Sequence, residues 1–202
     1  MSRSYESPSR KEHAEATRLG ILRALVDLIV EEGPGTISVP QVAARAGVSV
    51  RTVYHYFPTK EALFDGLTTA MPNMVATPDG DVPPTAHSPA ELASGMPGVY
   101  RYLEANRRMF RALSASELGG RVAESRRPER HGRMDTALEP LRERLDDAEY
   151  RRLRAVIGLV VSFDAYDALS DVWGLSTEEA AEAAAWAVRT LCERARRSGV
   201  TP

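Results

Sequence analysis

The sequence GVSVRTVYHYFPTK, residues 47–60, places an arginine, a threonine, a histidine and two tyrosines directly after a glycine. Glycine readily adopts the left-handed backbone of a tight turn, and Ser49 is a suitable N-cap for a helix that starts at the next residue. Pro58 ends that helix, because the residue before a proline disfavours helical backbone. On this helix Val53 and Phe57 lie four positions apart and face inward, so the polar side chains remain for the surface.

Helices are also predicted on both sides of this stretch. Apolar residues at spacings of three and four indicate an amphipathic helix over residues 11–32, which glycines and a proline end. A short helix follows, because Ser38 and Gln41 have the spacing of a capping box. Thr59 can cap a fourth helix, which comes after the one over residues 50–57. A short helix, a glycine turn and a second short helix form the helix-turn-helix pattern.

The remainder of the chain shows no strand pattern and no internal repeat, so the predicted fold class is all-α. Prolines and glycines between residues 72 and 98 indicate a linker. The arginine-rich segment 119–133 is predicted to be a mobile loop, with an anion site as the alternative. Four helices are expected in this part, over residues 99–116, 134–146, 147–173 and 176–197. Gly174 ends the third of them, and Ser176 with Glu179 forms the capping box of the fourth.

Composition excludes several classes of protein. Of the 202 residues, 43% are hydrophobic and 27% are charged, which suits a globular protein with a buried core. No apolar run approaches the roughly 20 residues of a membrane-spanning helix. The polar first residues contain no signal-peptide core, so we expect a cytoplasmic location. The formal net charge of −2 gives no global preference for nucleic acid, and any such binding must use a local patch.

The residue types that most often form catalytic or metal sites show no motif in this sequence. The four histidines have no metal-ligand spacing, and the sequence lacks the glycine-rich and nucleophile motifs of common enzymes. The single cysteine, Cys192, rules out an internal disulfide. We interpret it as a small buried apolar residue, with a redox sensor as the alternative. No catalytic site, metal or cofactor is therefore expected, although an all-α enzyme that uses carboxylates alone stays open.

The polar residues of the helix over residues 50–57 suit binding to DNA. Tyrosine and threonine hydroxyls, lysine and helix N-terminal amides are the donors that phosphates bind. Arginine pairs with guanine in the major groove, and apolar groups contact thymine methyls. The alternative is a solvated helix with incidental aromatics. Basic residues of the N-terminal arm either add DNA contacts or belong to a solvated tail: Arg3, Arg10, Lys11 and Arg18.

Residues 36–67, TISVPQVAARAGVSVRTVYHYFPTKEALFDGL, resemble the DNA-binding segment of TetR-family transcriptional regulators of bacteria. The resemblance rests on Ile37, Ala43, Ala46, Gly47, Val48, Ser49, Tyr54, Tyr56, Phe57, Lys60, Glu61, Ala62 and Leu63. It implies an Ω-shaped homodimer whose recognition helices enter successive major grooves of a palindromic operator in double-stranded DNA. It also implies DNA contacts from Ser38, Ser49, Val50, Arg51, Thr52, Tyr54, His55, Tyr56 and Lys60. Pro40 stands where some members carry a base-reading arginine, which leaves direct readout to Arg51.

The resemblance divides the chain into an arm with a DNA-binding domain, residues 1–66, and a helical ligand-binding and dimerisation domain, residues 67–202. It implies that the last two helices form a four-helix bundle with those of the partner. The stretch 153–163 is apolar all round, which fits a helix covered on more than one side. Candidate ligand residues, for which plain core is the alternative, are Tyr100, Leu103, Phe110, Met134, Leu138, Val160, Phe163 and Asp164. Asp164 starts an acidic stripe with Asp167 and Asp171, which suits either a cationic ligand or solvent.

Together these inferences predict a sequence-specific, ligand-responsive DNA-binding regulator, most simply a repressor, that acts as a homodimer with a small-molecule effector. Two rival functions stay open. One is a helical small-molecule-binding or enzymatic protein with a vestigial helix-turn-helix, which would bind or convert a ligand without specific DNA binding. The other is an architectural or protein-interaction module that docks a protein partner through its first domain and shows no salt-dependent DNA affinity.

Overall fold

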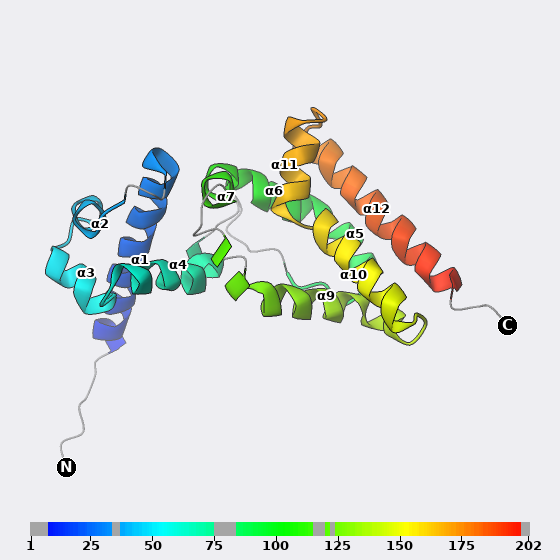
Figure 1. The fold of residues 1–202 in the computed structure, drawn as a ribbon, viewed down its shortest axis with the longest axis horizontal. Coiled ribbons are helices and arrows are strands. Elements are labelled where there is room, and N and C mark those ends of the chain that lie inside the picture. The colour runs from blue at the N-terminus through cyan, green and yellow to red at the C-terminus, as the bar shows by residue number, and fades with distance from the viewer. Residues whose placement is uncertain (1–7, 34–36, 75–83, 115–119, 122–123, 199–202) are drawn as a thin grey trace, which may run out of the picture. The chain divides into compact units, whose positions relative to one another are not determined.

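The computed structural model describes residues 8–33, 37–74, 84–114, 120–121 and 124–198, and Figure 1 shows its course. All regular elements in these residues are α-helices, which confirms the all-α prediction. No helix among the described residues is long and apolar enough to cross a membrane. The helices discussed below are α1 (Pro8–Glu32), α2 (Val39–Ala46), α3 (Val50–Tyr56), α4 (Lys60–Met74), α5 (Pro89–Ser94), α6 (Met96–Ala105), α7 (Arg107–Ser114), α9 (Arg127–Arg142), α10 (Asp147–Val160), α11 (Phe163–Asp171) and α12 (Thr177–Ser198).

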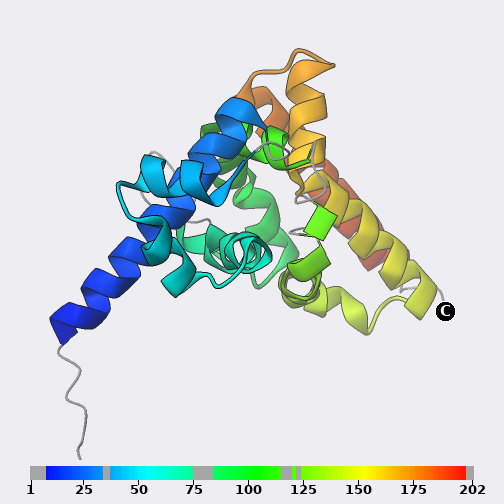
Figure 2. The same ribbon diagram turned by 60° about the vertical axis from the view of Figure 1, so that its left-hand side comes forward.

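The chain forms two compact units. The first comprises Met1–Val75 with Arg111–Ser125, and the second comprises Ala76–Phe110 with Arg126–Pro202. In the first unit α1 packs against α2 and α4, and α2 packs against α3, as the second view also shows (Figure 2). In the second unit α12 packs against α5, α6, α9, α10 and α11, so the C-terminal helix is the centre of that unit.

The core of the first unit follows from the amphipathic pattern of α1. The buried residues of α1 are Ile21, Leu22, Ala24, Leu25, Leu28 and Ile29. The capping box at the start of α2 is present, since Gln41 N–H donates to the hydroxyl of Ser38 and the Gln41 side chain accepts from the Ser38 N–H. Gly47 ends α2 with φ 67° and ψ 28°, a left-handed conformation that favours glycine. The predicted turn is therefore confirmed.

A close contact with α4 fixes the C-terminal end of α3. Val53 is fully buried and Phe57 is 3% exposed, as the spacing predicts. A Cβ atom at Gly66 of α4 would lie 2.4 Å from Cε1 of Phe57. The aromatic ring therefore packs directly on the backbone of α4, which only a glycine at position 66 allows without a shift of the ring.

The second unit has a core of alanines and tyrosines. On α12 the residues Ala180, Ala181, Ala184 and Ala185 are buried, and small side chains permit close approach of neighbouring helices. Tyr100 and Tyr166 are also buried, with ring centroids 5.1 Å apart in an edge-to-face arrangement. The Tyr100 hydroxyl donates to the carbonyl of Val160 at 2.8 Å, so its polar end is satisfied inside the core.

The prediction of one helix over residues 147–173 is wrong, because α10 ends at Val160 and α11 begins at Phe163. Ser162 lies at the break and acts as the N-cap of α11, with its hydroxyl oxygen 3.3 Å from the Ala165 nitrogen that donates to it. The same hydroxyl donates to the Leu159 carbonyl at 2.7 Å. Serine competes with helical hydrogen bonds in this way, and the apolar pattern around it hid the signal.

Three further boundaries differ from the predictions. The stretch 99–116 is broken at Asn106, whose side-chain amide donates to the Tyr102 carbonyl at 2.7 Å. The predicted loop over residues 119–133 is already helical from Arg127 onward, where α9 starts with a proline in its first turn. The predicted linker over residues 72–98 contains α5 and the start of α6, and its residues 75–83 lie outside the described residues.

Candidate nucleic-acid interface

The helix-turn-helix presents one face of α3 to solvent. Val50, Arg51, Tyr54 and His55 are exposed, and the spacing places Arg51 and His55 on the side opposite the buried Val53. Tyr54 is 48% exposed, which is a high value for an aromatic side chain. Its ring contacts no other aromatic ring in the described residues. Arginine, tyrosine and histidine together offer hydrogen-bond donors over a short, firmly anchored helix.

Two of the predicted hydroxyl donors already bind one another. Ser49 is the N-cap of α3 and accepts from the Thr52 N–H at 3.0 Å, and the two hydroxyl oxygens are 2.8 Å apart. One hydroxyl hydrogen of the pair is used in this contact, which leaves the other for a phosphate. The hydroxyl of Ser38 instead donates to Oε1 of Gln41 at 2.7 Å, so it must break that bond before it can donate to DNA.

The start of α4 is partly occupied by its own side chains. Thr59 accepts from the Ala62 N–H at 3.1 Å as an N-cap. The pKa of the Glu61 carboxyl is lowered by hydrogen bonds from the Glu61 backbone N–H and from the Thr59 hydroxyl. Lys60 is half-buried, with its ammonium 5.6 Å from the ring centroid of Phe64. A phosphate at this helix end therefore meets the positive charge of Lys60 and the competing negative charge of Glu61.

Tyr56 and the arm complete the predicted DNA residues. Tyr56 is half-buried and its ring lies 5.2 Å from that of His55 in an edge-to-face contact. Arg18 of α1 places its guanidinium 5.6 Å from the ring centroid of Phe57, which brings this arginine beside the end of α3. Arg3 lies outside the described residues.

Sequence reasoning missed the polar contacts between α1 and α2. Arg45 pairs with Glu31 through two hydrogen bonds of 2.9 and 2.5 Å, and the side-chain amide of Gln41 donates to Glu32 at 3.0 Å. Neither pair has a local signal, because the partners are nine and fourteen residues apart on different helices.

The predicted ligand residues of the second unit lie in and around its core. Tyr100, Leu103 and Leu138 are buried, and Asp164 is exposed. Phe110, Met134, Val160 and Phe163 are half-buried and pack against the core. The rings of Phe110 and Phe163 are 5.2 Å apart, and that of Tyr102 lies 6.1 Å from Phe110. These contacts leave both interpretations of the set, ligand pocket or core, as predictions.

A shallow hollow of about 250 Å³ lies between α5 and α12, and none of the predicted ligand residues lines it. Its walls include Pro89, Arg189 and Cys192. Burial raises the pKa of the Cys192 thiol to about 11, which keeps it protonated at neutral pH.

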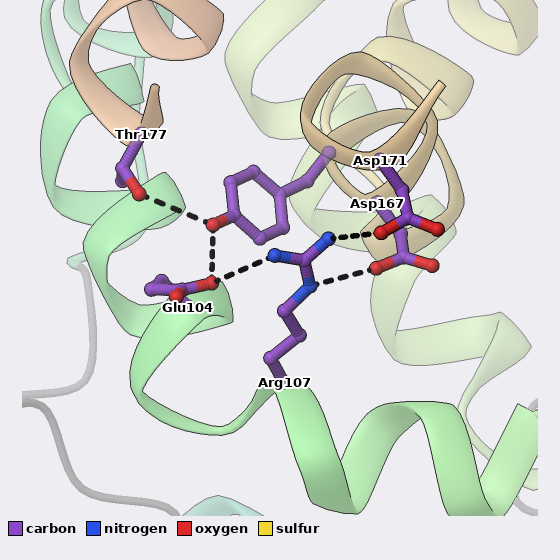
Figure 3. A network of polar contacts seen from close by, with 6 residues as sticks. Glu104, Arg107, Asp167, Asp171 and Thr177 are labelled. Atoms are coloured by element: carbon purple, nitrogen blue, oxygen red, sulfur yellow. Dashed lines mark hydrogen bonds and ion pairs between the residues drawn. The ribbon is translucent and has the colours of Figure 1, made fainter. Parts of the chain in front are cut away.

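The acidic stripe of α11 binds an arginine of the same chain (Figure 3). Arg107 donates from Nε to Asp167 at 2.9 Å and from Nη2 to Asp171 at 3.4 Å. It also lies 3.7 Å from the carboxylate of Glu104, which accepts from the hydroxyl of Tyr166 at 2.5 Å. Arg107 thus neutralises two of the three aspartates. Neither of the two interpretations from sequence, a site for a cationic ligand or a solvated stripe, predicted this internal pairing.

Large apolar side chains are exposed on the last helices. Val156 and Leu159 of α10 are 47% and 59% exposed, and Trp186 of α12 is 64% exposed. Val172 and Trp173, which follow α11, are each 74% exposed. These five side chains are therefore candidates for an interaction surface.

Comparison with known proteins gives a family match for part of the first unit. Residues 21–67, from the middle of α1 into α4, match the family described as bacterial regulatory proteins, tetR family. A search of curated proteins found no match.

Several solved structures share the fold over most of the chain. A TetR-family transcriptional regulator from Streptomyces coelicolor is 19% identical with a TM-score of 0.65, over 91% of this chain and 83% of that one. A TetR-like regulator from Rhodococcus sp. RHA1 is 17% identical with a TM-score of 0.60, over 88% and 94%. NalD, the secondary repressor of the MexAB-OprM multidrug efflux pump in Pseudomonas aeruginosa, is 23% identical with a TM-score of 0.54, over 92% and 96%.

The family match covers the helix-turn-helix whose exposed face is described above, and the structural similarity extends the shared fold over both units. Residues 21–67 thus match the tetR family of bacterial regulatory proteins, and most of the chain has the fold of solved TetR-family regulators.

Proposed function

We propose that this protein is a ligand-responsive transcriptional repressor of the TetR family that binds a palindromic operator as a homodimer in the cytoplasm. The observation that carries the proposal is the exposed face of α3, where Val50, Arg51, Tyr54 and His55 stand on a helix anchored by Val53 and Phe57. The repressor role is proposed by analogy with NalD, which has the same fold.

Base reading is assigned to the N-terminal half of α3. Arg51 suits guanine, to which its guanidinium can donate two hydrogen bonds, and Val50 suits a thymine methyl. Tyr54 and Tyr56 contact bases or the adjacent backbone. Because Pro40 replaces a donor on α2, we assign the main sequence discrimination to Arg51.

Phosphate contacts are assigned to donors that flank this helix. The free hydroxyl hydrogen of the Ser49–Thr52 pair and the ammonium of Lys60 support this assignment. The full set of proposed phosphate contacts is Ser38, Ser49, Thr52, Tyr54, His55 and Lys60. Each neutralised phosphate adds to the salt dependence of binding.

Dimerisation is assigned to α10 and α12 of the domain formed by residues 67–202, with DNA binding assigned to residues 1–66. The exposed Val156, Leu159 and Trp186 support this, since apolar side chains of this size are normally covered. In an isologous dimer the same patch on both copies is buried together. A small-molecule effector is proposed to bind among the half-buried aromatics Phe110 and Phe163 and their neighbours.

Selection of bound duplexes from a random DNA pool tests the proposal. We expect a palindromic consensus with half-sites about 34–36 Å apart, the spacing of successive major grooves. Failure to enrich any sequence at low salt, with or without candidate effectors, would contradict the proposal and favour a ligand- or protein-binding module.

A further inference from the structure

Two acidic residues at the C-terminal end of α1 hold side chains of α2. Arg45 donates from Nη1 and Nη2 to the two carboxylate oxygens of Glu31, at 2.9 and 2.5 Å. This hydrogen bonding to Glu31 raises the pKa of Arg45. Gln41 Nε2 donates to Oε2 of Glu32 at 3.0 Å. These four residues, Glu31, Glu32, Gln41 and Arg45, are called the α1–α2 clamp below.

Gln41 serves the clamp and the capping box at once. Its Oε1 accepts from the backbone N–H and the hydroxyl of Ser38, at 2.8 and 2.7 Å, while its Nε2 reaches Glu32. A glutamate would accept from Ser38 equally well, but when ionised it has no hydrogen to donate to Glu32. The side chain that starts α2 therefore also ties the helix to α1.

Tertiary contacts with α1, both apolar and polar, hold α2 in place. The helix has eight residues, and its buried residues are Val39, Val42 and Ala43. A helix of this length is marginal in water, so tertiary contacts must fix its place. α3 follows after the turn at Gly47, and a rotation of α2 on α1 is therefore expected to carry the exposed face of α3 with it.

We propose that Glu31 and Glu32 are positioning residues for sequence-specific DNA binding. Through Arg45 and Gln41 they hold α2, and with it α3, in the orientation in which bases are read. The inference rests on the proposed DNA-binding role of α3. Neither acid contacts DNA, and both act through α2.

A different role for Arg45 predicts the opposite result. If Arg45 were a phosphate contact for which Glu31 competes, removal of the Glu31 charge would free the guanidinium and strengthen binding to every sequence. If the clamp positions α3, the same change weakens binding to the preferred sequence. The sign of the effect of Glu31→Gln therefore separates the two roles.

The test uses the full chain, a duplex selected from the random pool and a scrambled duplex. Glu31→Gln and Arg45→Ala are each expected to weaken binding to the selected duplex about two- to fivefold, the energy scale of an exposed ion pair. The slope of log affinity against log salt should stay at the wild-type value. The double variant Glu31→Arg with Arg45→Glu restores the pair and should recover the lost affinity.

The matched control is Glu12→Gln. Glu12 is exposed on α1, and the described residues show no ion pair for it, so this variant reports the general effect of one removed negative charge. Circular dichroism and thermal unfolding establish that each variant is folded. Recovery in the double variant then distinguishes lost orientation from lost charge.

Three results would overturn the inference. The first is a sign that Arg45 contacts a phosphate. That sign is either tighter DNA binding by Glu31→Gln than by Glu12→Gln, or a salt slope lowered by about 1 in Arg45→Ala. The second is wild-type affinity in both single variants. The third is a folded double variant that recovers nothing. A wild-type chain that enriches no duplex contradicts the proposed function itself, and this is seen before any variant is made.

Discussion

Arg51 and Lys60 are expected to act differently on DNA. Arg51 is exposed on α3, and Lys60 is half-buried at the start of α4. Arg51→Ala should relax specificity at one position of each half-site by about 1–3 kcal/mol, because a bidentate contact to guanine is lost. Lys60→Ala should weaken all sequences alike and lower the salt slope by about 1. Fluorescence anisotropy on matched and mismatched duplexes measures both. Equal losses on the two duplexes for both variants would show that the roles are assigned wrongly.

The hydroxyls of Ser38, Ser49 and Thr52 are engaged within the protein. Sequence alone shows that Ser38, Ser49 and Thr52 have the chemistry for phosphates, but each hydroxyl has an intramolecular partner in the structure. Ser38 is the most fully engaged, since its hydroxyl donates to Gln41 and accepts from the Gln41 N–H. We therefore expect Ser38 to contribute to DNA binding through α2 capping more than through direct donation.

At the scale of elements, Arg107 joins α6, α7 and α11 through Glu104, Asp167 and Asp171. Its side chain is 23% exposed, so these bonds are partly shielded from water. Arg107→Gln should lower the free energy of unfolding by about 1–2 kcal/mol, since charged hydrogen bonds are lost without full burial. Urea unfolding measures this. Arg108→Gln, on the exposed side of α7, is the control, and equal effects of the two variants would count against the network.

The capping box of α12 predicts a pH dependence of stability. The backbone N–H and then the hydroxyl of Ser176 lower the pKa of Glu179 from its ordinary 4.5. A carboxylate whose pKa is lower in the folded than in the unfolded state stabilises the folded state at pH values above its ordinary pKa. This stabilisation is lost as the pH falls through the pKa of the folded state. The midpoint temperature of thermal unfolding should therefore decrease as the pH is lowered below about 4.5, and this decrease should be smaller in Glu179→Gln. Identical pH profiles of the two proteins would contradict this.

Helix starts and turns were predictable because their signals are local. The capping boxes at Ser38 and Ser176 and the turn at Gly47 involve residues within a few positions of one another. The break at Ser162 was missed, since an apolar pattern of helical period runs through it and a single serine carries little weight. The Arg107 network joins residues about sixty positions apart, and periodicity cannot predict which charged side chains meet.

The residues predicted to contact DNA were also predictable only as far as their signals are local. The exposed face of α3 was predictable from the period of Val53 and Phe57, because burial of one face leaves the other to solvent. The contact of Phe57 with Gly66 and the pairing of Arg45 with Glu31 arise only when α4 and α1 pack in three dimensions. Sequence therefore predicts what the helix presents, and tertiary packing determines how it is held.

At the scale of the whole molecule, the exposed apolar side chains Val156 and Leu159 of α10 and Trp186 of α12 predict a dimer. Light scattering of the wild type should give twice the 22.1 kDa of one chain. Trp186→Glu should shift the equilibrium toward one chain, because a charge at the apolar patch must be desolvated on association. Arg101→Glu, at an exposed position of α6, is the control and should leave the mass unchanged. A wild-type mass of 22.1 kDa at micromolar concentration would contradict the dimer.

The most direct measurement is a titration of the wild-type chain onto the selected palindromic duplex and onto the same duplex with scrambled half-sites, followed by anisotropy. We expect two chains per palindromic duplex and an affinity at least about 10³-fold higher than for the scrambled one, the lower range of specific protein–DNA recognition. Equal affinities for the two duplexes would contradict sequence reading by α3.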